Sequence, residues 1–512
     1  KEHSRMPRNA RTIWVQDFKG QNDSAVPGKS PIFTPSLSNV KARFGLISGR
    51  GGMTKYQSIA TAAGNPPVLG LFNYRRVSNT HELLRLTLTK LEKLSGGAWT
   101  DVTGTAFTHT ATARPQYDVI DDILVLTNEG VQRPRKYIGS GNSVEIASST
   151  MPFCKGIKAY LGFLFAINYS DNGTFTDIFE QYRTAQFADD WENDWSACAG
   201  NTIVLDETPG AWIASEVLGR HMLGIKTDGV VVVTHIGGDR VFQQEKISSI
   251  GCAAPLSIRK TQEQEVILLG PEGVLYKISP SGMEPVAQLQ LSNTLPTKVS
   301  LARFKWARAL VDSDETTYYL FYDRTSLTGQ FLDSYVAYNY RSGEVFSGTL
   351  GANVIAAESF KSDEHASESL LLSTNTLVEE FDSGKDDDGV AITRSWTTGW
   401  QDMQETGWLH GCRVVMKKGA TTRIKIAVAT DFNESFGSEQ TVSLAGGQKS
   451  DAIVEAQWRP GAPQLAKWIN VRVKLFHGVA ASKSEIQRVG FEIMPVLPTA
   501  ETQPRVGEAT AI

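Results

Sequence analysis

The 512-residue sequence lacks the features that would place it in a membrane or mark it as a nucleic-acid-binding protein. Its apolar runs fall well short of the roughly eighteen residues that a membrane-spanning helix needs. Basic residues are not in excess, because 51 Lys and Arg stand against 55 Asp and Glu, a net charge of −4. A protein whose main task is to grip nucleic acid usually carries a basic surface. The basic N-terminal segment KEHSRMPRNAR has no apolar stretch behind it, so it does not resemble a secretory signal.

Residues that form disulfides or bind metals are also sparse. The eight histidines show no H-E-x-x-H or comparable ligand spacing. His221 and His235 share one repeat, and a pair across a hairpin is usually structural. We therefore expect no metal and no cofactor. Buried thiols are favoured for the cysteines, with one or two disulfides as the alternative. The four cysteines lie far apart with no C-x-x-C pair: Cys154, Cys198, Cys252 and Cys412.

Glycine is abundant, with 45 residues, and one kind of phrase recurs along the chain. In VILLGPEGVLYKI, which starts at Val266, an apolar run stops at a polar turn and a second strand-like run follows. Turns such as Thr-Asp-Gly and Pro-Glu-Gly tolerate a positive φ, which we expect at Gly229 and Gly273. About seven instances occur, beginning near Val68, Ile123, Leu161, Met222, Val266, Tyr318 and Leu370.

The spacing of these phrases predicts the fold of the first three quarters of the chain. Their mean separation is about fifty residues, and four short antiparallel strands with their turns use about forty to fifty. One such unit cannot bury both faces, so neighbouring units must stack around an axis. We predict an all-β protein with a β-propeller of about seven blades over residues 61–388. An irregular array of β-sandwiches is the alternative, and THELLRLTLTKLEKL is ambiguous between strand and helix.

The pattern changes near Gly389, where the charged turn KDDDG follows FDSG and indicates a domain boundary. Six strand-like runs after it predict a compact β-sandwich over residues 389–496. Residues 1–60 have few periodic runs and are predicted to form an N-terminal arm or edge that leans on a partner. Residues 497–512 are predicted to form an extended C-terminal arm. Proteolysis between Gly384 and Gly389 should then release a folded C-terminal fragment.

Two motifs resemble catalytic signatures but do not match them. PGKS at Pro27 to Ser30 lacks the first glycine of a phosphate-binding loop, which would fall at Asp23, and Pro31 follows where a helix should start. NYSDNGTF, from Asn168 to Phe175, resembles the aspartate-box turn of sialidase propellers only in part. An ordinary hairpin turn is favoured for it. No pair of carboxylates stands out as a glycosidase site.

Two acidic stretches have a structural and a functional interpretation. In FADDWENDW, Trp191 and Trp195 could bind sugars beside carboxylates, but packing beneath a neighbouring blade is the favoured interpretation. In DSGKDDDG, Asp386 and Asp388 could face a cation, yet the calcium-loop spacing is absent. We assign no catalytic, cofactor-binding or metal-binding residue.

Four small basic clusters are most simply solvated surface, although together they could line something negatively charged. The clusters are Arg75–Arg76, RPRK at Arg133 to Lys136, RFKWAR at Arg303 to Arg308, and Lys417–Lys418. RPRK is the foremost candidate for isolated contacts to DNA or for pairing with acidic neighbours.

One stretch carries a family resemblance. The segment from Gly251 to Ile258, with Cys252, Ala254, Pro255 and Ser257 between them, precedes a strand that ends in a Gly-x-x-Tyr turn. Together with Trp191 to Trp195 upstream and the leader VPGKSPIFTPSLSNVKARFGLISGRGGMTKY, it resembles propeller-containing tail nozzle or hub proteins of short-tailed bacteriophages. The resemblance covers roughly residues 20 to 390 and excludes the predicted sandwich.

The resemblance implies a virion structural protein of the phage tail and no enzyme. Such proteins form a homo-oligomeric ring, typically a homohexamer, that retains the genome and conducts DNA at ejection. Implied partners are further copies, the adaptor, tail fibres or spikes, and weakly contacted genomic DNA. A slightly acidic chain suits a channel wall that must not hold the phosphate backbone. The alternatives are a propeller glycoside hydrolase or lyase acting on host surface polysaccharide, and a carbohydrate- or protein-binding propeller that works as a monomer.

Overall fold

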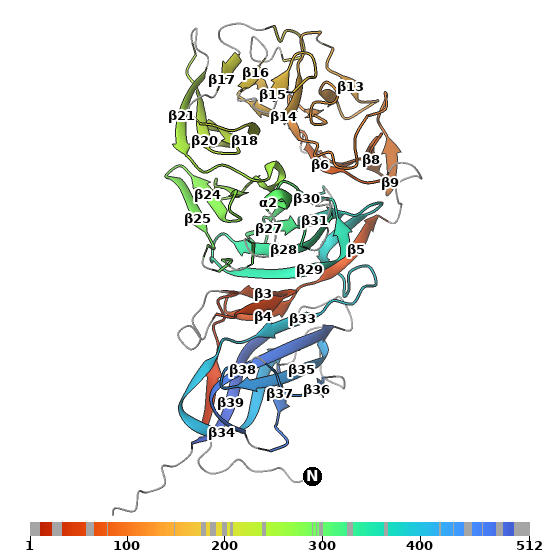
Figure 1. The fold of residues 1–512 in the computed structure, drawn as a ribbon. Helices are drawn as coiled ribbons and strands as arrows, with labels where there is room; N and C mark the ends of the chain where they lie inside the picture. Colours follow the sequence, from red (N-terminus) through yellow and green to blue (C-terminus); the bar gives the residue numbers. More distant parts are fainter. Residues whose placement is uncertain are drawn as a thin grey trace, which may run out of the picture.

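The computed structural model describes residues 11–22, 33–57, 66–78, 80–147, 149–175, 181–184, 191–196, 202–204, 208–237, 242–288, 290–292, 294–295, 301–324, 331–362, 367–418, 421–433, 435–444, 453–462, 464–477 and 485–495. The fold is almost entirely β, as predicted, and has two parts stacked end to end (Figure 1). A ring of small sheets forms one part, and one large sheet that includes the C-terminal strands forms the other.

The ring is a β-propeller of four-stranded antiparallel sheets, six of which use four consecutive strands each. These six sheets are β6–β9 (Gly70–Arg75, His81–Leu86, Leu91–Ser95, Ala98–Asp101), β10–β13 (Tyr117–Ile120, Ile123–Leu126, Arg135–Tyr137, Val144–Glu145), β14–β17 (Phe153–Tyr160, Phe163–Ser170, Gln181–Thr184, Thr202–Val204), β18–β21 (Trp212–Leu218, His221–Lys226, Val230–His235, Phe242–Ser248), β22–β25 (Arg259–Lys260, Val266–Leu269, Leu275–Ser279, Gly282–Val286) and β26–β29 (Arg308–Asp312, Thr317–Tyr322, Leu332–Asn339, Val345–Val354). The ambiguous stretch THELLRLTLTKLEKL forms β7 and β8.

One further sheet closes the ring and is composite. It combines β30 (Ala356–Phe360), β31 (Ser369–Ser373) and β32 (Val378–Ser383) with β5 (Gly52–Gln57) from the N-terminal region. The first strands of successive sheets lie against one another around the whole circle, from β6 and β10 to β30 and back to β6. Because β5 supplies the outer strand of this sheet, the two distant ends of the propeller sequence are joined by a backbone ladder.

The recurring phrase of the sequence marks these sheets. Most instances fall on the second and third strands, which are buried on both faces and are joined by tight turns. Gly273 lies in such a turn with φ of +79°, as predicted. The same prediction for Gly229 is wrong, because its φ is not positive. A Cβ there would instead lie 2.8 Å from Cγ2 of Thr208, so Gly229 serves a close approach. Two short helical turns, η1 (Pro255–Ser257) and α2 (Leu301–Phe304), lie between strands.

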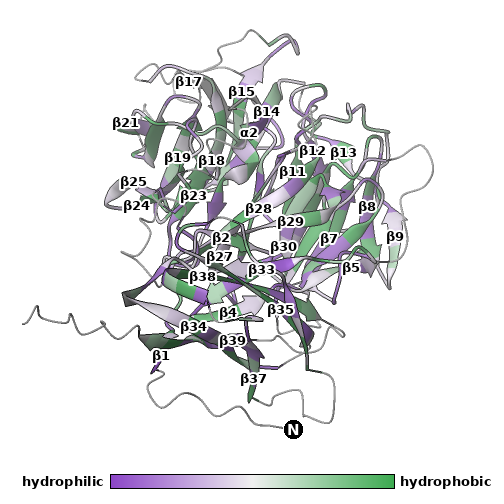
Figure 2. Cartoon of the chain, turned by 60° about the horizontal axis from the view of Figure 1, so that its bottom comes forward, coloured by the Kyte–Doolittle hydropathy of each residue, from purple (hydrophilic) through white to green (hydrophobic). Residues whose placement is uncertain are grey.

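The second part is a β-sandwich whose two halves join into one barrel-like, eleven-stranded sheet. Strands β34 and β38 pair at their N-terminal ends and then diverge, β34 to lie between β39 and β37 and β38 to lie between β33 and β35. The C-terminal strands are β33 (Arg394–Thr397), β34 (Gln401–Lys417), β35 (Thr421–Thr430), β36 (Gln440–Ser443), β37 (Ile453–Trp458), β38 (Gln464–His477) and β39 (Glu485–Pro495). Figure 2 shows hydrophobic and hydrophilic segments along the same strands, as expected for sheets buried on one face.

Residues 1–60 were predicted to form an arm or edge that leans on a partner; their described strands include edge strands, but these belong to the sheets of this chain. They pair within this chain: β2 (Ser36–Ser38) with β33, β1 (Arg11–Val15) and β4 (Leu46–Gly49) with β39, and β3 (Val40–Arg43) with β4. The physical reason is that both parts would otherwise present unpaired strand edges. The sandwich therefore needs β1–β4 in addition to the predicted residues 389–496. The predicted arm at 497–512 lies outside the described residues.

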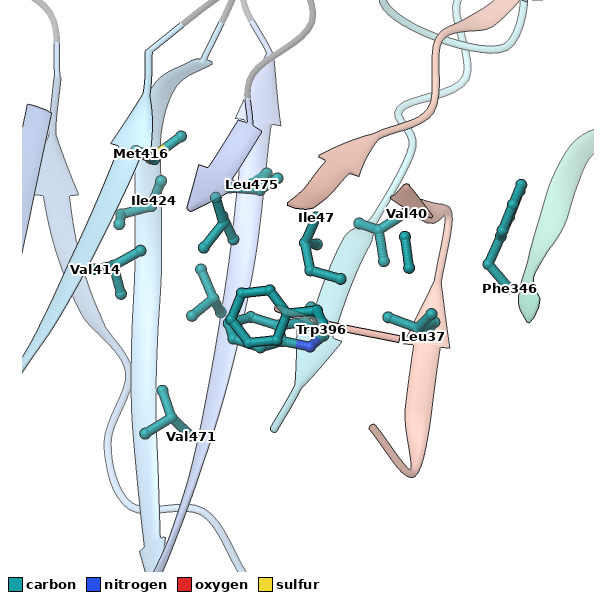
Figure 3. Close-up of a cluster of buried hydrophobic side chains, with 14 of the residues drawn as sticks. Leu37, Val40, Ile47, Phe346, Trp396, Val414, Met416, Ile424, Val471 and Leu475 are labelled. Carbon is teal, nitrogen blue, oxygen red and sulfur yellow. The ribbon is translucent and has the colours of Figure 1, made fainter. Parts of the chain in front are cut away.

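The core of the sandwich runs into the propeller without a break (Figure 3). Trp396 of β33 is fully buried, and Phe18 packs edge-on against it with ring centroids 4.7 Å apart. Leu37 and Val40 lie on the other side of Trp396, between the sandwich and Phe346 of the propeller strand β29. The two parts therefore share one hydrophobic cluster.

A buried arginine, Arg50, also connects the sandwich to the propeller. Arg50 donates from Nε to Asn39 Oδ1, from Nη1 to Gly51 O and Asp387 Oδ1, and from Nη2 to Thr349 O and Asp387 Oδ2, over distances of 2.6 to 2.9 Å. Arg50 and Asp387 are 0% and 3% exposed. We call Arg50, Asp387, Asn39 and Thr349 the Arg50 junction. The turn at Gly384 to Gly389, predicted as an open linker, is thus anchored to both parts.

Candidate functional site

A group of charged side chains lies on the propeller axis, around a small cavity that we call the axial cavity. Its lining comes from the first strands of all the sheets, together with the turn η1. Its volume is about 90 Å³, below the roughly 300–1,000 Å³ of most small-molecule sites. The charged lining residues are Lys158, Glu216, Arg259, Arg308 and Glu358.

Lys158 bridges two carboxylates on one side of this cavity. Its Nζ lies 3.0 Å from Glu216 and 3.4 Å from Asp118. Burial alone would lower the pKa of Lys158, but the two carboxylates raise it above its usual value. Burial alone would raise the pKa of Glu216, yet the charge of Lys158 and the Val217 N–H keep it below its usual value. The Lys158 ammonium therefore has two carboxylate partners within this cavity wall.

Glu358 and Arg259 form a second pair, with Arg259 Nη2 3.6 Å from Glu358 Oε2. Burial raises the pKa of Glu358, and Arg259 offsets that rise only in part. The Nε of Arg259 is buried and has no hydrogen-bond partner among the described residues. This pair is therefore looser than the Lys158 triad.

Arg308, the first residue of β26, is the least satisfied group of the axial cavity. It is 8% exposed, and no ion pair or side-chain hydrogen bond is found for it in the part of the chain that the structure describes. Burial lowers its pKa to about 9, and the nearby charges of Arg114 and Arg259 act in the same direction. Arg114 itself pairs with Glu129 at 2.8 Å. The cluster RFKWAR thus ends in a residue at the axis, which the sequence could not indicate.

The segment that carries the phage resemblance covers one wall of the same cavity. Pro255 and Ile258 line it, and the intervening turn is held from within. Ser257 Oγ donates to Ala254 O at 2.7 Å and accepts from Leu269 N at 3.1 Å. Tyr318 donates its hydroxyl to Ser257 O at 2.7 Å. The motif therefore forms the turn that leads directly into β22.

The other basic cluster singled out in the sequence, RPRK, is largely internal. Arg135 is 3% exposed, and its Nη2 donates to Thr103 O and Ser143 O, each at 2.7 Å. Lys136 pairs with Glu192 at 2.7 Å. The hypothesis that RPRK contacts DNA is not supported, since its central arginine caps backbone carbonyls and its lysine pairs with an acidic neighbour.

The aromatic and turn motifs have the structural roles that we favoured. Trp191 and Trp195 are 2% and 0% exposed and pack between the β10–β13 and β14–β17 sheets. Trp191 Nε1 donates to Asp121 at 2.8 Å. In NYSDNGTF, Asn172 Oδ1 accepts from Thr174 N at 2.9 Å, which closes a local turn.

The proposed cation ligands are separated or already engaged. Asp386 accepts from Gly389 N, and Asp388 lies 3.4 Å from Lys55. His221 bonds Thr234 at 2.9 Å, whereas His235 contacts the ring of Phe163. No group of three potential metal ligands occurs within the described residues. The three cysteines in that part of the chain, Cys154, Cys252 and Cys412, are buried free thiols; Cys198 and the PGKS segment lie outside it.

An apolar patch lies on the outer face of the sandwich, near the middle of β34. Trp408 is directly opposite Leu465 of β38 on one side and opposite Met494 of β39 on the other. Trp408 and Leu465 are 38% and 48% exposed. We call Trp408, Leu465 and Met494 the apolar row.

No helix among the described residues is long and apolar enough to span a membrane.

Comparison with known proteins identifies no family. No family model and no curated protein match the chain. An exo-β-1,3-galactanase from Phanerochaete chrysosporium is 9% identical, with a TM-score of 0.27 over 85% of this chain and 100% of that one. The N-terminal domain of Nup159 is 10% identical, with a TM-score of 0.28 over 73% and 96%. A glycoside hydrolase family 43 arabinoxylan arabinofuranohydrolase from Bacillus subtilis is 9% identical, with a TM-score of 0.21 over 92% and 99%. These values assign no activity, and the propeller assignment rests on the strand pairing.

Proposed function

We propose that this chain is a structural protein of a bacteriophage virion, a tail nozzle or hub subunit that assembles into a ring around the path of the DNA. The observation that carries the proposal is the apolar row on an otherwise complete sandwich. The core beneath it is closed, so Trp408 and Leu465 are not needed on the outer face for folding. Exposed aromatic and aliphatic side chains at the centre of a patch are typical of subunit contacts.

The propeller itself supports a structural role rather than a channel through each subunit. The axial cavity is about 90 Å³ and is crossed by ion pairs, so the axis of one propeller cannot admit DNA. The conduit must then lie between copies, where cyclic symmetry repeats one wall around an axis. A chain with net charge −4 gives that wall little affinity for phosphates.

The firm connection between the propeller and the sandwich also suits a subunit that must keep its shape while DNA is conducted. β1–β4 complete the sandwich while β5 completes the propeller, and the Arg50 junction lies between them. In such a subunit the apolar row on the sandwich stays in a fixed position relative to the propeller while DNA passes.

The test is the oligomeric state of the full chain and of matched variants. Light scattering after size exclusion should give the mass of a homohexamer for the parent. Leu465→Asp should dissociate it, while Val77→Asp, at a 91% exposed position on the propeller, should not. A strictly monomeric parent at high concentration, or dissociation by both substitutions equally, would contradict the proposal.

A propeller glycoside hydrolase is the second candidate, and one observation favours it. Glu216 and Glu358 line one cavity, and the pKa of the first is lowered while that of the second is raised, as in acid and base pairs. Against it, each carboxylate is paired with a cation and the cavity is too small for a sugar chain. Release of sugar from bacterial polysaccharide by the parent, abolished in Glu358→Gln, would establish this candidate.

A further inference from the structure

Arg308 is a buried cation with no ion pair among the described residues, although the charges of Glu129 and Glu358 offset part of the effect of its burial. It is 8% exposed and lines the axial cavity from β26, between Arg259 on β22 and Glu358 on β30. The nearest carboxylates are committed elsewhere, since Glu358 pairs with Arg259 and Glu129 pairs with Arg114. The guanidinium of Arg308 therefore has donors that no described residue accepts.

Such a group is costly unless something else compensates it. Even with its pKa lowered to about 9, Arg308 keeps its proton at neutral pH, so the charge remains there. An unpaired buried charge costs several kcal/mol. The neighbouring cations Arg114 and Arg259 increase the cost, because they repel Arg308. A negatively charged occupant of the cavity beside Arg308 would reduce this cost, since the two carboxylates of the lining, Glu216 and Glu358, are each already paired with a cation.

The cavity also has a second guanidinium, whose Nη1 donates to Ile258 O at 3.1 Å, and an apolar cover. Arg259 shares the lining with Arg308, and its buried Nε has no partner within the described part of the chain. Pro255, Leu256 and Ile258 line the same space, which excludes water from one wall and strengthens charge interactions there. Planar guanidinium groups are the side chains best suited to hold an oxyanion by paired hydrogen bonds.

The volume limits the ligand to a small one. About 90 Å³ has room for several water molecules, and so for a tetrahedral oxyanion that replaces them. A nucleotide or a sugar chain requires more space than this. We propose that the axial cavity binds one small tetrahedral oxyanion of the phosphate or sulfate class, held by Arg308 and Arg259.

The experiment compares the parent with Arg308→Met and with Arg341→Met, whose arginine is exposed and paired with Glu263 on the surface. Thermal unfolding is followed with inorganic phosphate and then sulfate, against chloride at equal ionic strength. The parent and Arg341→Met should gain Tm with either oxyanion. Arg308→Met should show no such gain, and should be at least as stable as the parent in chloride because the unpaired charge is gone. A purely structural role for Arg308 predicts loss of stability in chloride instead.

Equilibrium dialysis with labelled inorganic phosphate measures binding directly and does not depend on the stability of the protein. We expect one site per chain, weakened about tenfold or more in Arg308→Met. An equal Tm gain in all three proteins, or no saturable phosphate binding by the parent, would overturn the inference. Because the site lies on the propeller axis and away from the apolar row, these outcomes do not bear on ring assembly.

Discussion

Arg50→Met should destabilise the protein more than any surface substitution. Methionine fills a similar volume but leaves the Asp387 carboxylate, 3% exposed, with the Gly351 N–H at 2.8 Å and without its ion-pair partner. Removing one partner of a buried ion pair costs about 3–5 kcal/mol. Three further acceptors, on Asn39, Gly51 and Thr349, lose a donor, and each unsatisfied group costs about 1–3 kcal/mol when no water replaces it.

The pair and the three acceptors together give a loss of at least about 6 kcal/mol when no water enters, a large part of the 5–15 kcal/mol that stabilises a typical domain. Urea unfolding followed by tryptophan fluorescence measures it, and hydrogen exchange should show the loss first in β3–β5. The double variant Arg50→Met with Asp387→Leu should recover much of the stability, because a buried pair can be replaced by apolar residues at little cost. Arg341→Met, at an exposed ion pair, should change stability by less than about 1 kcal/mol. A loss below about 1 kcal/mol for Arg50→Met would refute the reasoning.

Further predictions concern other buried or strained positions. Burial and the nearby Asp388 and Asp387 raise the pKa of Glu379 to about 7, above its ordinary value of 4.5, while Lys55 opposes the rise. Between pH 4.5 and pH 7 the Glu379 carboxyl therefore holds a proton in the folded state that it has lost in the unfolded state. Its stabilising contribution is greatest below pH 4.5 and is lost as pH rises through 7. Glu379→Gln should raise stability at pH 8 by up to about 3 kcal/mol and flatten the pH dependence measured by urea midpoints; an unchanged slope would exclude Glu379 as its source. Gly273→Val should cost about 1–3 kcal/mol, because valine must adopt a φ near +79°, and a variant with the parent's Tm would show that this turn is not strained.

The spacing of strand-like runs was enough to predict the propeller, because each run and its turn lie within one sheet and obey local rules. The burial of Trp191 and the positive φ of Gly273 followed for the same reason. The role of residues 1–60 could not be predicted in this way. β2–β5 are only 3 to 6 residues long, and β5 pairs with β32, which lies more than 300 positions further along the chain.

The axial cavity was equally hidden in the sequence. Arg259, Arg308 and Glu358 belong to three different sheets and meet only because the ring closes. RFKWAR resembled a solvated basic cluster, and nothing in its pattern separates the buried Arg308 from its neighbours. Nothing in the local sequence marks Lys41 and Arg50 as buried, although both are at most 3% exposed and paired with carboxylates far along the chain. Contacts of this kind depend on tertiary closure, which local patterns do not encode.

The ring itself is the central claim, and electron microscopy of the purified full chain, with a mass measurement on the same sample, tests it most directly. The account predicts closed rings of about six copies of the 56.0-kDa chain around an open channel wide enough for duplex DNA. Single 56.0-kDa particles at high protein concentration, with no closed rings, would contradict it.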